Sequence, residues 1–338
     1  MIKIGVIGFG YWGPNLVRTF TIPGKCEASI VADLDPAKLR RARERFPGIP
    51  TTSDVADLWK DPEIDAVAIA TPVRSHFGLA EAALKAGKHV FVEKPMTETV
   101  EQGRRLIELA ARKNRVLMVD HTFVYTPAVQ RIRKLVQSGE LGKIYYYDSL
   151  RINLGLFQHD VNVLWDLAVH DLSILDYVLD ARPLAVSAVG ISHVPGAPEN
   201  VAYLSLFMPE DTVAHINVNW LAPVKVRQTL IGGSKKMIVF DDLEPSEKLK
   251  VYDRGITLNE KPEQVYETLV GYRTGDMWAP NLPVTEALHT EALHFCACIA
   301  GEETPITGGE MGLRLVQTLE LATQSMKQQG LPITFPGA

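Results

Sequence analysis

Short runs of apolar, mostly β-branched residues alternate with helical stretches through the first 120 residues. Apolar runs of this kind, separated by amphipathic segments, are typical of parallel strands that helices cover on both faces. The pattern therefore predicts an α/β domain built on a doubly wound parallel sheet. The expected strands cover residues 2–7, 28–32, 66–70, 89–92 and 116–119, and the expected helices cover residues 14–20, 36–46, 77–86 and 100–113.

The pattern changes after about residue 120. Val213 to Trp220 alternates, with Ala214, Ile216, Val218 and Trp220 on one face and His215, Asn217 and Asn219 on the other. Such alternation predicts a mainly antiparallel sheet with one covered face. We therefore expect two domains, a cofactor-binding domain at 1–120 and an α+β domain at 121–338. The second is expected to hold helices at 127–138, 162–179, 284–300 and 309–328, and strands at 144–152, 184–194, 201–208, 212–221, 225–232 and 236–241.

Composition narrows the functional class. The chain has 338 residues, of which 46% are hydrophobic and 22% charged, with a net charge of −5. These values are ordinary for a globular protein and do not suit a basic nucleic-acid binder. No apolar run reaches membrane-spanning length, and the three cysteines show neither a disulfide framework nor zinc-ligand spacing. We expect a cytoplasmic protein without a metal site.

A glycine-rich loop follows the first strand. Gly8-Phe9-Gly10-Tyr11-Trp12-Gly13 matches G-x-G-x-x-G, which is weak evidence alone but specific between a strand and a helix. The first glycine makes the tight turn, the second admits a pyrophosphate, and the third allows close helix packing. Asp33 ends the next strand, where a carboxylate can bind the ribose hydroxyls and disfavour a 2′-phosphate. The loop and Asp33 predict NAD rather than NADP, and Asp35 is the better candidate for the helix cap.

Two further segments carry candidate chemistry. Lys94 follows the strand at 89–92, at the carboxyl end of a parallel sheet, where functional side chains gather; an exposed loop lysine is the alternative. On the expected helix 162–179, Asn162, Asp166 and His170 recur at four-residue spacing and share one face. His170 is the natural proton carrier near neutral pH. An internally satisfied Asp166–His170 pair is an alternative, as is a metal site with His159, which we do not expect; Arg151, Asn153, Gln158 and His159 are nearby polar candidates.

These motifs together resemble the Gfo/Idh/MocA family of oxidoreductases, over nearly the whole chain. The resemblance rests on the glycine loop, on Ala70-Thr71-Pro72 with His76, on the stretch from Ala86 to Pro95, on Asp166 with His170, and on Glu291 with His294-Phe295. One departure is Asp120 before His121, where many relatives have a glycine; it bears on the local turn rather than on the chemistry.

The resemblance implies a Rossmann domain followed by an open-faced sheet domain, and reversible oxidation of a sugar-like secondary alcohol. It implies that Lys94 polarises the reacting hydroxyl, that His170 exchanges its proton and that Asp166 fixes the substrate or His170. It also implies cofactor contacts and a homo-oligomer through the open sheet face. The expected cofactor-binding residues are those of the glycine loop with Asp33, Thr71, Pro72, His76, Glu93, Lys94 and Trp165.

The expected substrate is a nucleotide-activated sugar such as UDP-N-acetylglucosamine or its uronate, oxidised at C3 to a keto sugar. Segments around Arg151 and Trp165, and the stretch Tyr272 to Asp276, resemble family members that act on such sugars. Arg151 and Arg273 offer planar forks for a diphosphate, although structural ion pairs are the alternative for both. The expected substrate-binding residues are Lys94, Arg151, Asn153, Asn162, Asp166, His170 and Arg273. A free polyol or hexose, and a non-catalytic NAD(H)-binding regulator, are the competing functions.

Overall fold

The computed structural model describes residues 1–155, 161–258 and 270–337, and the chain divides into two compact units. The first unit comprises residues 1–125 and 285–320, and the second comprises residues 126–284 and 321–338. The first boundary lies near the expected position. The return of residues 285–320 to the first unit differs from the expected division at residue 120.

A parallel sheet forms the centre of the first unit. Its strand order over residues 1–120, all of which are described, is β3-β2-β1-β4-β5-β6, the Rossmann order. The order reverses between β1 and β4, and ligands bind such sheets beyond the carboxyl ends of the strands at this point. The strands are β1 (Ile2–Ile7), β2 (Cys26–Ala32), β3 (Thr51–Thr52), β4 (Ala66–Ile69), β5 (His89–Glu93) and β6 (Leu117–Asp120).

Helices connect these strands, and local chemistry explains several of their ends. Asp35 accepts a hydrogen bond from the Ala37 amide and caps α2, as expected, and Thr99 caps α5 by accepting from the Gln102 amide. Helix α4 begins at Val73, directly after Pro72 and four residues before the expected start at Phe77. The helical elements are α1 (Gly13–Thr19), α2 (Pro36–Arg45), α3 (Ala56–Lys60), α4 (Val73–Lys85), α5 (Val100–Lys113) and the 3₁₀ turn η1 (Thr122–Tyr125).

Aromatic packing explains why α8 (Ala287–Ile299) belongs to the first unit. Phe295 of α8 packs with its ring centroid 6.0 Å from that of Phe20 and 5.4 Å from that of Phe91. All three side chains are buried, and such aromatic clusters bury large apolar areas. The contact is remote in sequence, which is why the local pattern did not reveal it. Helix α9 (Gly309–Lys327) then begins in the first unit and ends in the second.

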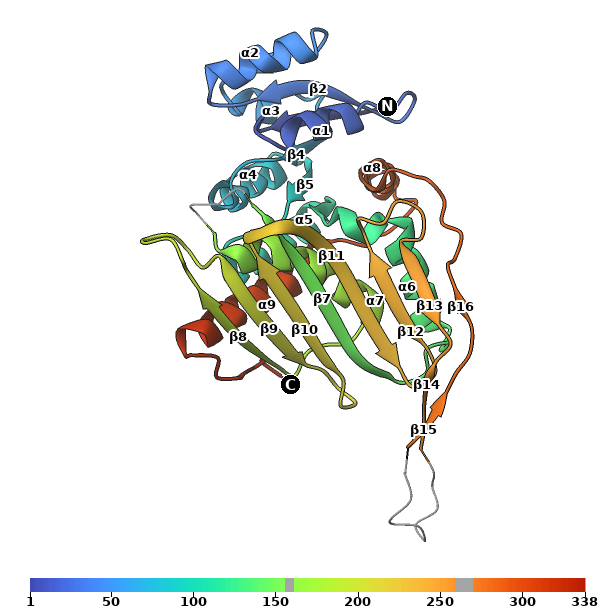
Figure 1. Cartoon of the computed structure of the whole chain (residues 1–338). Coiled ribbons are helices and arrows are strands. Elements are labelled where there is room, and N and C mark those ends of the chain that lie inside the picture. Colours follow the sequence, from blue (N-terminus) through green and yellow to red (C-terminus); the bar gives the residue numbers. More distant parts are fainter. Residues whose placement is uncertain (156–160, 259–269, 338) are drawn as a thin grey trace. The chain divides into compact units, whose positions relative to one another are not determined.

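A mixed sheet forms the second unit. Within the described residues its order is β16-β13-β12-β11-β7-β10-β9-β8-β17; β10 pairs parallel with β7, and the other neighbours pair antiparallel. Helices α6 (Pro127–Gln137) and α7 (Val169–Leu179) lie against one face of the sheet (Figure 1). The strands are β7 (Ile144–Leu154), β8 (Ala185–Ile191), β9 (Val201–Phe207), β10 (Val213–Asn219), β11 (Leu221–Gly233), β12 (Met237–Asp241), β13 (Leu249–Tyr252), β16 (Met277–Trp278) and β17 (Ile333–Thr334), with a separate hairpin of β14 (Gly255–Leu258) and β15 (Val270–Arg273).

The other face of this sheet is open to solvent in the single chain. Ala214, Ile216 and Val218 of β10 are fully buried, as the alternation predicts, and they point to the helix-covered side. The opposite face carries large side chains that stay exposed, among them Tyr203 (42% exposed) and Phe207 (44%) of β9. An open face with exposed aromatic residues is a feature of interaction surfaces.

None of the described helices combines the length and the apolar character needed to cross a membrane.

Candidate active site

The glycine loop of the first unit leaves room for a ligand where the motif requires it. Gly8 has φ +96°, and a Cβ there would lie 2.5 Å from the Ala70 carbonyl oxygen. A Cβ on Gly13 would lie 2.1 Å from the Gly8 carbonyl oxygen, so only glycine permits this close turn. A Cβ on Gly10 would meet nothing within 4 Å. The loop therefore packs tightly through its outer glycines and is open at the central one, where a pyrophosphate approaches in Rossmann folds.

Asp33 is held at this loop by two backbone amides. Its Oδ2 accepts from the Phe9 amide at 2.7 Å, its Oδ1 accepts from the Asp35 amide at 2.9 Å, and Lys38 Nζ lies 3.7 Å from Oδ2. Each carboxylate oxygen has a second lone pair. Asp33 can therefore accept ribose hydroxyls while the loop fixes its orientation, and these residues fit a dinucleotide.

The end of β4 is tied to the segment that follows β5. His76, which is buried, places Nε2 2.8 Å from the Thr71 carbonyl oxygen and Nδ1 2.9 Å from the Pro95 carbonyl oxygen. Ser75 donates to Thr71 Oγ1 at 2.7 Å. Pro72 is exposed beside them. His76 thus positions the strand ends from within, and its expected role at the cofactor is indirect.

Two expected cofactor-binding residues lie beside Asp120 in the first unit. The indole N–H of Trp12 donates to Asp120 Oδ2 at 2.8 Å, while Tyr11 beside it is 86% exposed. Glu93 ends β5 opposite Asp120 in the sheet register, and its Oε1 is buried. Lys94, the next residue, is half-buried. Trp12 and Glu93 therefore both lie beside Asp120, a neighbour that sequence reasoning did not name for them.

In the second unit, the expected helix 162–179 is interrupted. Residues Leu164–Ala168 form a π-helical segment, η2, and α7 begins only at Val169. A π-helical turn spaces side chains differently from an α-helix and is frequent at functional sites. Asp166 lies on η2 and His170 on α7, both half-buried. Asp166 accepts from the indole N–H of Trp220 at 3.1 Å, a partner that the sequence analysis did not name.

Two other residues of this stretch have structural contacts. Asn162 is buried; its Oδ1 accepts from the amides of Leu164 (3.1 Å) and Trp165 (3.3 Å), and its Nδ2 donates to Glu199. It therefore caps the helical segment. The indole N–H of Trp165 donates to Thr323 Oγ1 at 3.0 Å. Both side chains are thus held by contacts within the second unit.

A buried ion pair anchors the start of α7. Arg151 donates from Nε to Asp171 Oδ2 at 2.7 Å and from Nη2 to Oδ1 at 3.2 Å, and both side chains are almost fully buried. Ser149 donates to Asp171 Oδ1 at 2.7 Å, and the Tyr147 hydroxyl donates to the Asp171 carbonyl oxygen at 3.2 Å. These three residues alternate along β7 and so share one face.

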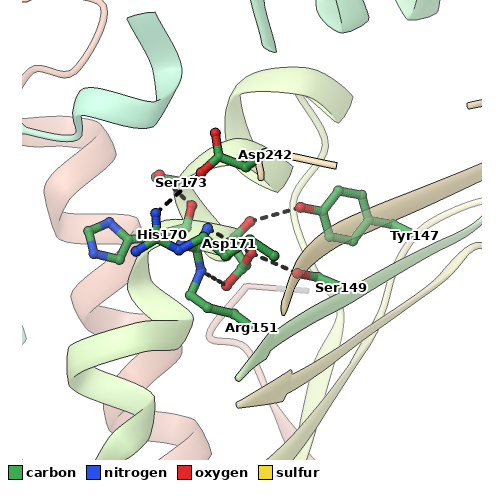
Figure 2. Close-up of polar contacts among 8 residues, drawn as sticks. Tyr147, Ser149, Arg151, His170, Asp171, Ser173 and Asp242 are labelled. Atoms are coloured by element: carbon green, nitrogen blue, oxygen red, sulfur yellow. Dashed lines mark hydrogen bonds and ion pairs between the residues drawn. The ribbon is translucent and has the colours of Figure 1, made fainter. Parts of the chain in front are cut away.

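The anchored residue is the direct neighbour of His170. Figure 2 shows the His170 ring pointing away from the cluster around Asp171, and Ser173 donates to the His170 carbonyl oxygen at 2.7 Å. Removing one member of a buried ion pair typically costs about 3–5 kcal/mol because the remaining charge is left uncompensated. The pair therefore fixes the backbone from which His170 projects.

The contacts of Arg151 and Arg273 bear on their expected role in binding a diphosphate. The guanidinium of Arg151 is 4% exposed and engaged by Asp171, which favours the structural ion pair over diphosphate binding. Arg273 contacts Asp253 Oδ1 at 2.6 Å and the Lys235 carbonyl oxygen. The turn at Lys235 packs on Leu141, before β7 begins, so Arg273 lies near the opposite end of β7 from Arg151, roughly 25 Å along the strand. The structure does not bring the two side chains together.

The remaining candidate site residues have few described contacts. Asn153 is half-buried near the end of β7. Gln158 and His159 lie outside the described residues. Among the residues that the structure does describe, no group of three or more His, Cys, Asp or Glu side chains is arranged to hold a metal ion.

Comparison with known proteins shows which proteins this chain is similar to. The family model "Oxidoreductase family, NAD-binding Rossmann fold" matches residues 2–121, and the model "GFO/IDH/MocA C-terminal domain" matches residues 129–239. UDP-N-acetylglucosamine 3-dehydrogenase of Acidithiobacillus ferrooxidans is 28% identical over 306 residues, which are 89% of this chain and 93% of that enzyme. A solved structure of that enzyme has a TM-score of 0.81 at 25% identity, covering 96% and 98% of the two chains.

Two other similarities are informative. A 1-carboxy-3-chloro-3,4-dihydroxycyclohexa-1,5-diene dehydrogenase of Comamonas testosteroni is 30% identical over 197 residues, 55% of this chain, and the match spans half the length of that relative. A levoglucosan dehydrogenase in complex with NADH and L-sorbose shares the fold, with a TM-score of 0.83, 22% identity and 99% coverage of both chains. The two family models cover most of the chain, and the chain therefore belongs to the Gfo/Idh/MocA family of NAD-binding oxidoreductases.

Proposed function

We propose that this oxidoreductase oxidises the C3 hydroxyl of a nucleotide-activated sugar, such as UDP-N-acetylglucosamine or its uronate, to a keto sugar. The observation that supports this substrate is the similarity to the A. ferrooxidans 3-dehydrogenase, which extends over 89% of this chain and over both units. Bound NAD⁺ supplies the hydride acceptor for such a reaction. The chain must then bind the sugar, orient its secondary hydroxyl and remove one proton.

The proposed roles of the polar side chains are those that the family resemblance implies. Lys94 stands at the carboxyl end of β5, where a Rossmann sheet presents functional groups, and it polarises the reacting hydroxyl as an ammonium donor. His170 accepts the hydroxyl proton as general base. Asp166, whose orientation the Trp220 indole restrains at 3.1 Å, binds a second sugar hydroxyl or orients His170.

A second candidate substrate is a free polyol or hexose. The buried ion pair of Arg151 favours it, because that guanidinium is committed to Asp171 and one expected diphosphate contact is lost. A free sugar needs no such cation. The presence of Lys94, Asp166 and His170 together argues against a non-catalytic NAD(H)-binding regulator.

The substrate assignment is tested with a panel. The chain is incubated with NAD⁺ and, separately, UDP-N-acetylglucosamine, its uronate, myo-inositol and glucose, and NADH formation is followed by absorbance. We expect turnover with at least one nucleotide sugar and little with the free compounds. Turnover of myo-inositol or glucose with none for either nucleotide sugar would reverse the assignment in favour of the second candidate.

The proposed catalytic residues are tested by truncation. Lys94→Ala and His170→Ala should each lower turnover by about 10²–10⁴-fold, the usual contribution of a positioned acid or base, while NAD⁺ affinity stays close to that of the wild type. His289→Ala, which removes an exposed histidine of α8, is the matched control and should be fully active. A near wild-type rate in His170→Ala would assign the proton transfer to Lys94 alone.

Asp33 is proposed to select NAD over NADP. Because a carboxylate at the ribose repels a 2′-phosphate, we expect a lower dissociation constant for NAD⁺ than for NADP⁺ and a smaller difference in Asp33→Ala. Asp35→Ala removes a nearby carboxylate that caps α2 and should leave the ratio unchanged. Equal affinity of the wild-type chain for both cofactors, measured by calorimetry, would contradict the proposed role.

We further propose that a second copy of this chain covers the open face of β8, β9 and β10. The exposed aromatic side chains there support it, since burying them between copies is favourable. Light scattering should give a mass that is a multiple of 37.4 kDa. Phe207→Glu should lower that mass, whereas Val284→Glu, at a fully exposed position off this sheet, should not. A wild-type monomer would be evidence against the interface.

A further inference from the structure

The glycine loop of the first unit is tied to the sheet at both of its ends, by carboxyl groups that follow or end two different strands. At its beginning, Asp33, directly after β2, accepts from the Phe9 amide at 2.7 Å. At its end, the indole N–H of Trp12 donates to Asp120 Oδ2 at 2.8 Å. Asp120 is the last residue of β6, which lies on the other side of β1 from β2 in the sheet order. The two carboxyl groups therefore hold the loop from opposite sides of its own strand.

The segment between these two anchors is the part that a cofactor meets. Among the residues that the structure describes, no acceptor is bonded to the backbone amides of residues 10–13. A Cβ on Gly10 would meet nothing within 4 Å, and the Tyr11 side chain is 86% exposed. Successive backbone amides beside an open glycine are what a Rossmann fold offers to a pyrophosphate. These amides can act together only while the segment keeps one conformation.

Trp12 connects the loop, the helix that follows it and β6. Its carbonyl oxygen accepts from the Asn15 amide at 2.8 Å and from the Leu16 amide at 3.3 Å, which fixes its backbone to the first turn of α1. Its side chain is fixed separately by Asp120, whose other carboxylate oxygen accepts from the Thr122 hydroxyl at 2.5 Å. Asp120 is 2% exposed, which limits the access of competing water. One buried acceptor therefore determines where the indole lies, and with it the conformation of the loop.

We propose that Asp120 is a positioning residue for NAD: by accepting from the Trp12 indole, it holds the glycine loop in its binding conformation before the cofactor arrives. The proposal rests on the NAD binding that family membership establishes and not on the proposed sugar substrate. It invokes Asp120 as a hydrogen-bond acceptor and not its charge, so a neutral acceptor of the same shape should replace it. Without this bond the loop populates other conformations, and the apparent dissociation constant rises as the competent fraction falls.

The bond is tested first from the donor side, because that variant leaves the Asp120 side chain in place. Trp12→Phe removes the indole N–H and keeps an aromatic ring. We expect the dissociation constants of NAD⁺ and of NADH each to rise about tenfold, the effect of a loop that is competent about one tenth of the time. Trp59→Phe changes a half-buried tryptophan of α3 and is the matched control, with wild-type affinity for both cofactors. The constants are measured by calorimetry without substrate.

The acceptor side separates positioning from general damage. Asp120→Asn keeps an oxygen that can accept from the indole and should bind NAD⁺ nearly as the wild type does, whereas Asp120→Ala should lose about tenfold. In Trp12→Phe/Asp120→Ala the loss should be no greater than in either single variant, because both remove the same bond. Losses that add to about a hundredfold, or a loss in Asp120→Asn as large as in Asp120→Ala, would refute the proposal. Wild-type affinity in Trp12→Phe would refute it as well.

A spectroscopic measurement decides if Asp120→Ala does not fold, as judged by circular dichroism. The Trp12 indole N–H is identified by nuclear magnetic resonance as the indole signal that Trp12→Phe removes. In the folded wild type without cofactor, this proton should exchange with deuterium far more slowly than the N–H of a free indole. Exchange at the free rate would show that the bond is not formed before binding and would overturn the proposal. Because no turnover is measured, failure of the substrate assignment leaves this result unaffected.

Discussion

A charge in the interior of a protein must be paired or hydrogen-bonded, and this constraint organises the polar residues of both units. In the second unit, the Arg151–Asp171 pair joins β7 to the beginning of α7, with Ser149 satisfying a further lone pair of the carboxylate. In the first unit, Asp120 accepts from the Trp12 indole of the glycine loop and from the Thr122 hydroxyl of η1. In each unit, a buried aspartate thus ties together segments that are separate in the sequence.

The helices and strands were predictable because the spacing of apolar side chains along the chain depends only on local backbone geometry. The alternation from Val213 to Trp220 identified the buried face of β10 correctly, and the apolar runs identified five of the six strands of the Rossmann sheet. The two-residue strand β3 has no apolar run and was missed. The return of α8 to the first unit was not predictable in this way. It depends on Phe295 packing against Phe20 and Phe91, a contact between residues far apart in sequence, and no local pattern encodes which apolar surface a closing helix will cover.

For the candidate site, the sequence indicated where its segments lie in the fold, but it indicated less well which way their side chains point. Motif spacing located the glycine loop, Asp33 and the end of β5, because backbone geometry imposes glycine and strand ends there. It did not reveal that Trp12 donates to Asp120 or that Arg151 forms an ion pair with Asp171. A polar side chain near a predicted site can either contact the ligand or bond to a buried partner. Which of the two it does depends on residues from other helices and strands.

The interior partners stand next in sequence to the residues that we propose for chemistry. Glu93 precedes Lys94 at the end of a strand, and Asp171 follows His170 at the start of a helix. Consecutive side chains point in different directions in strands and in helices, so one member of each pair can be locked in the interior while the other projects from the same rigid backbone. Such an arrangement fixes the backbone from which each of the two proposed catalytic side chains projects. The departure from the family pattern at Asp120 acquires a physical meaning in this light. The Asp120 carboxylate accepts from the Trp12 indole and from the Thr122 hydroxyl, and a glycine at this position could make neither contact.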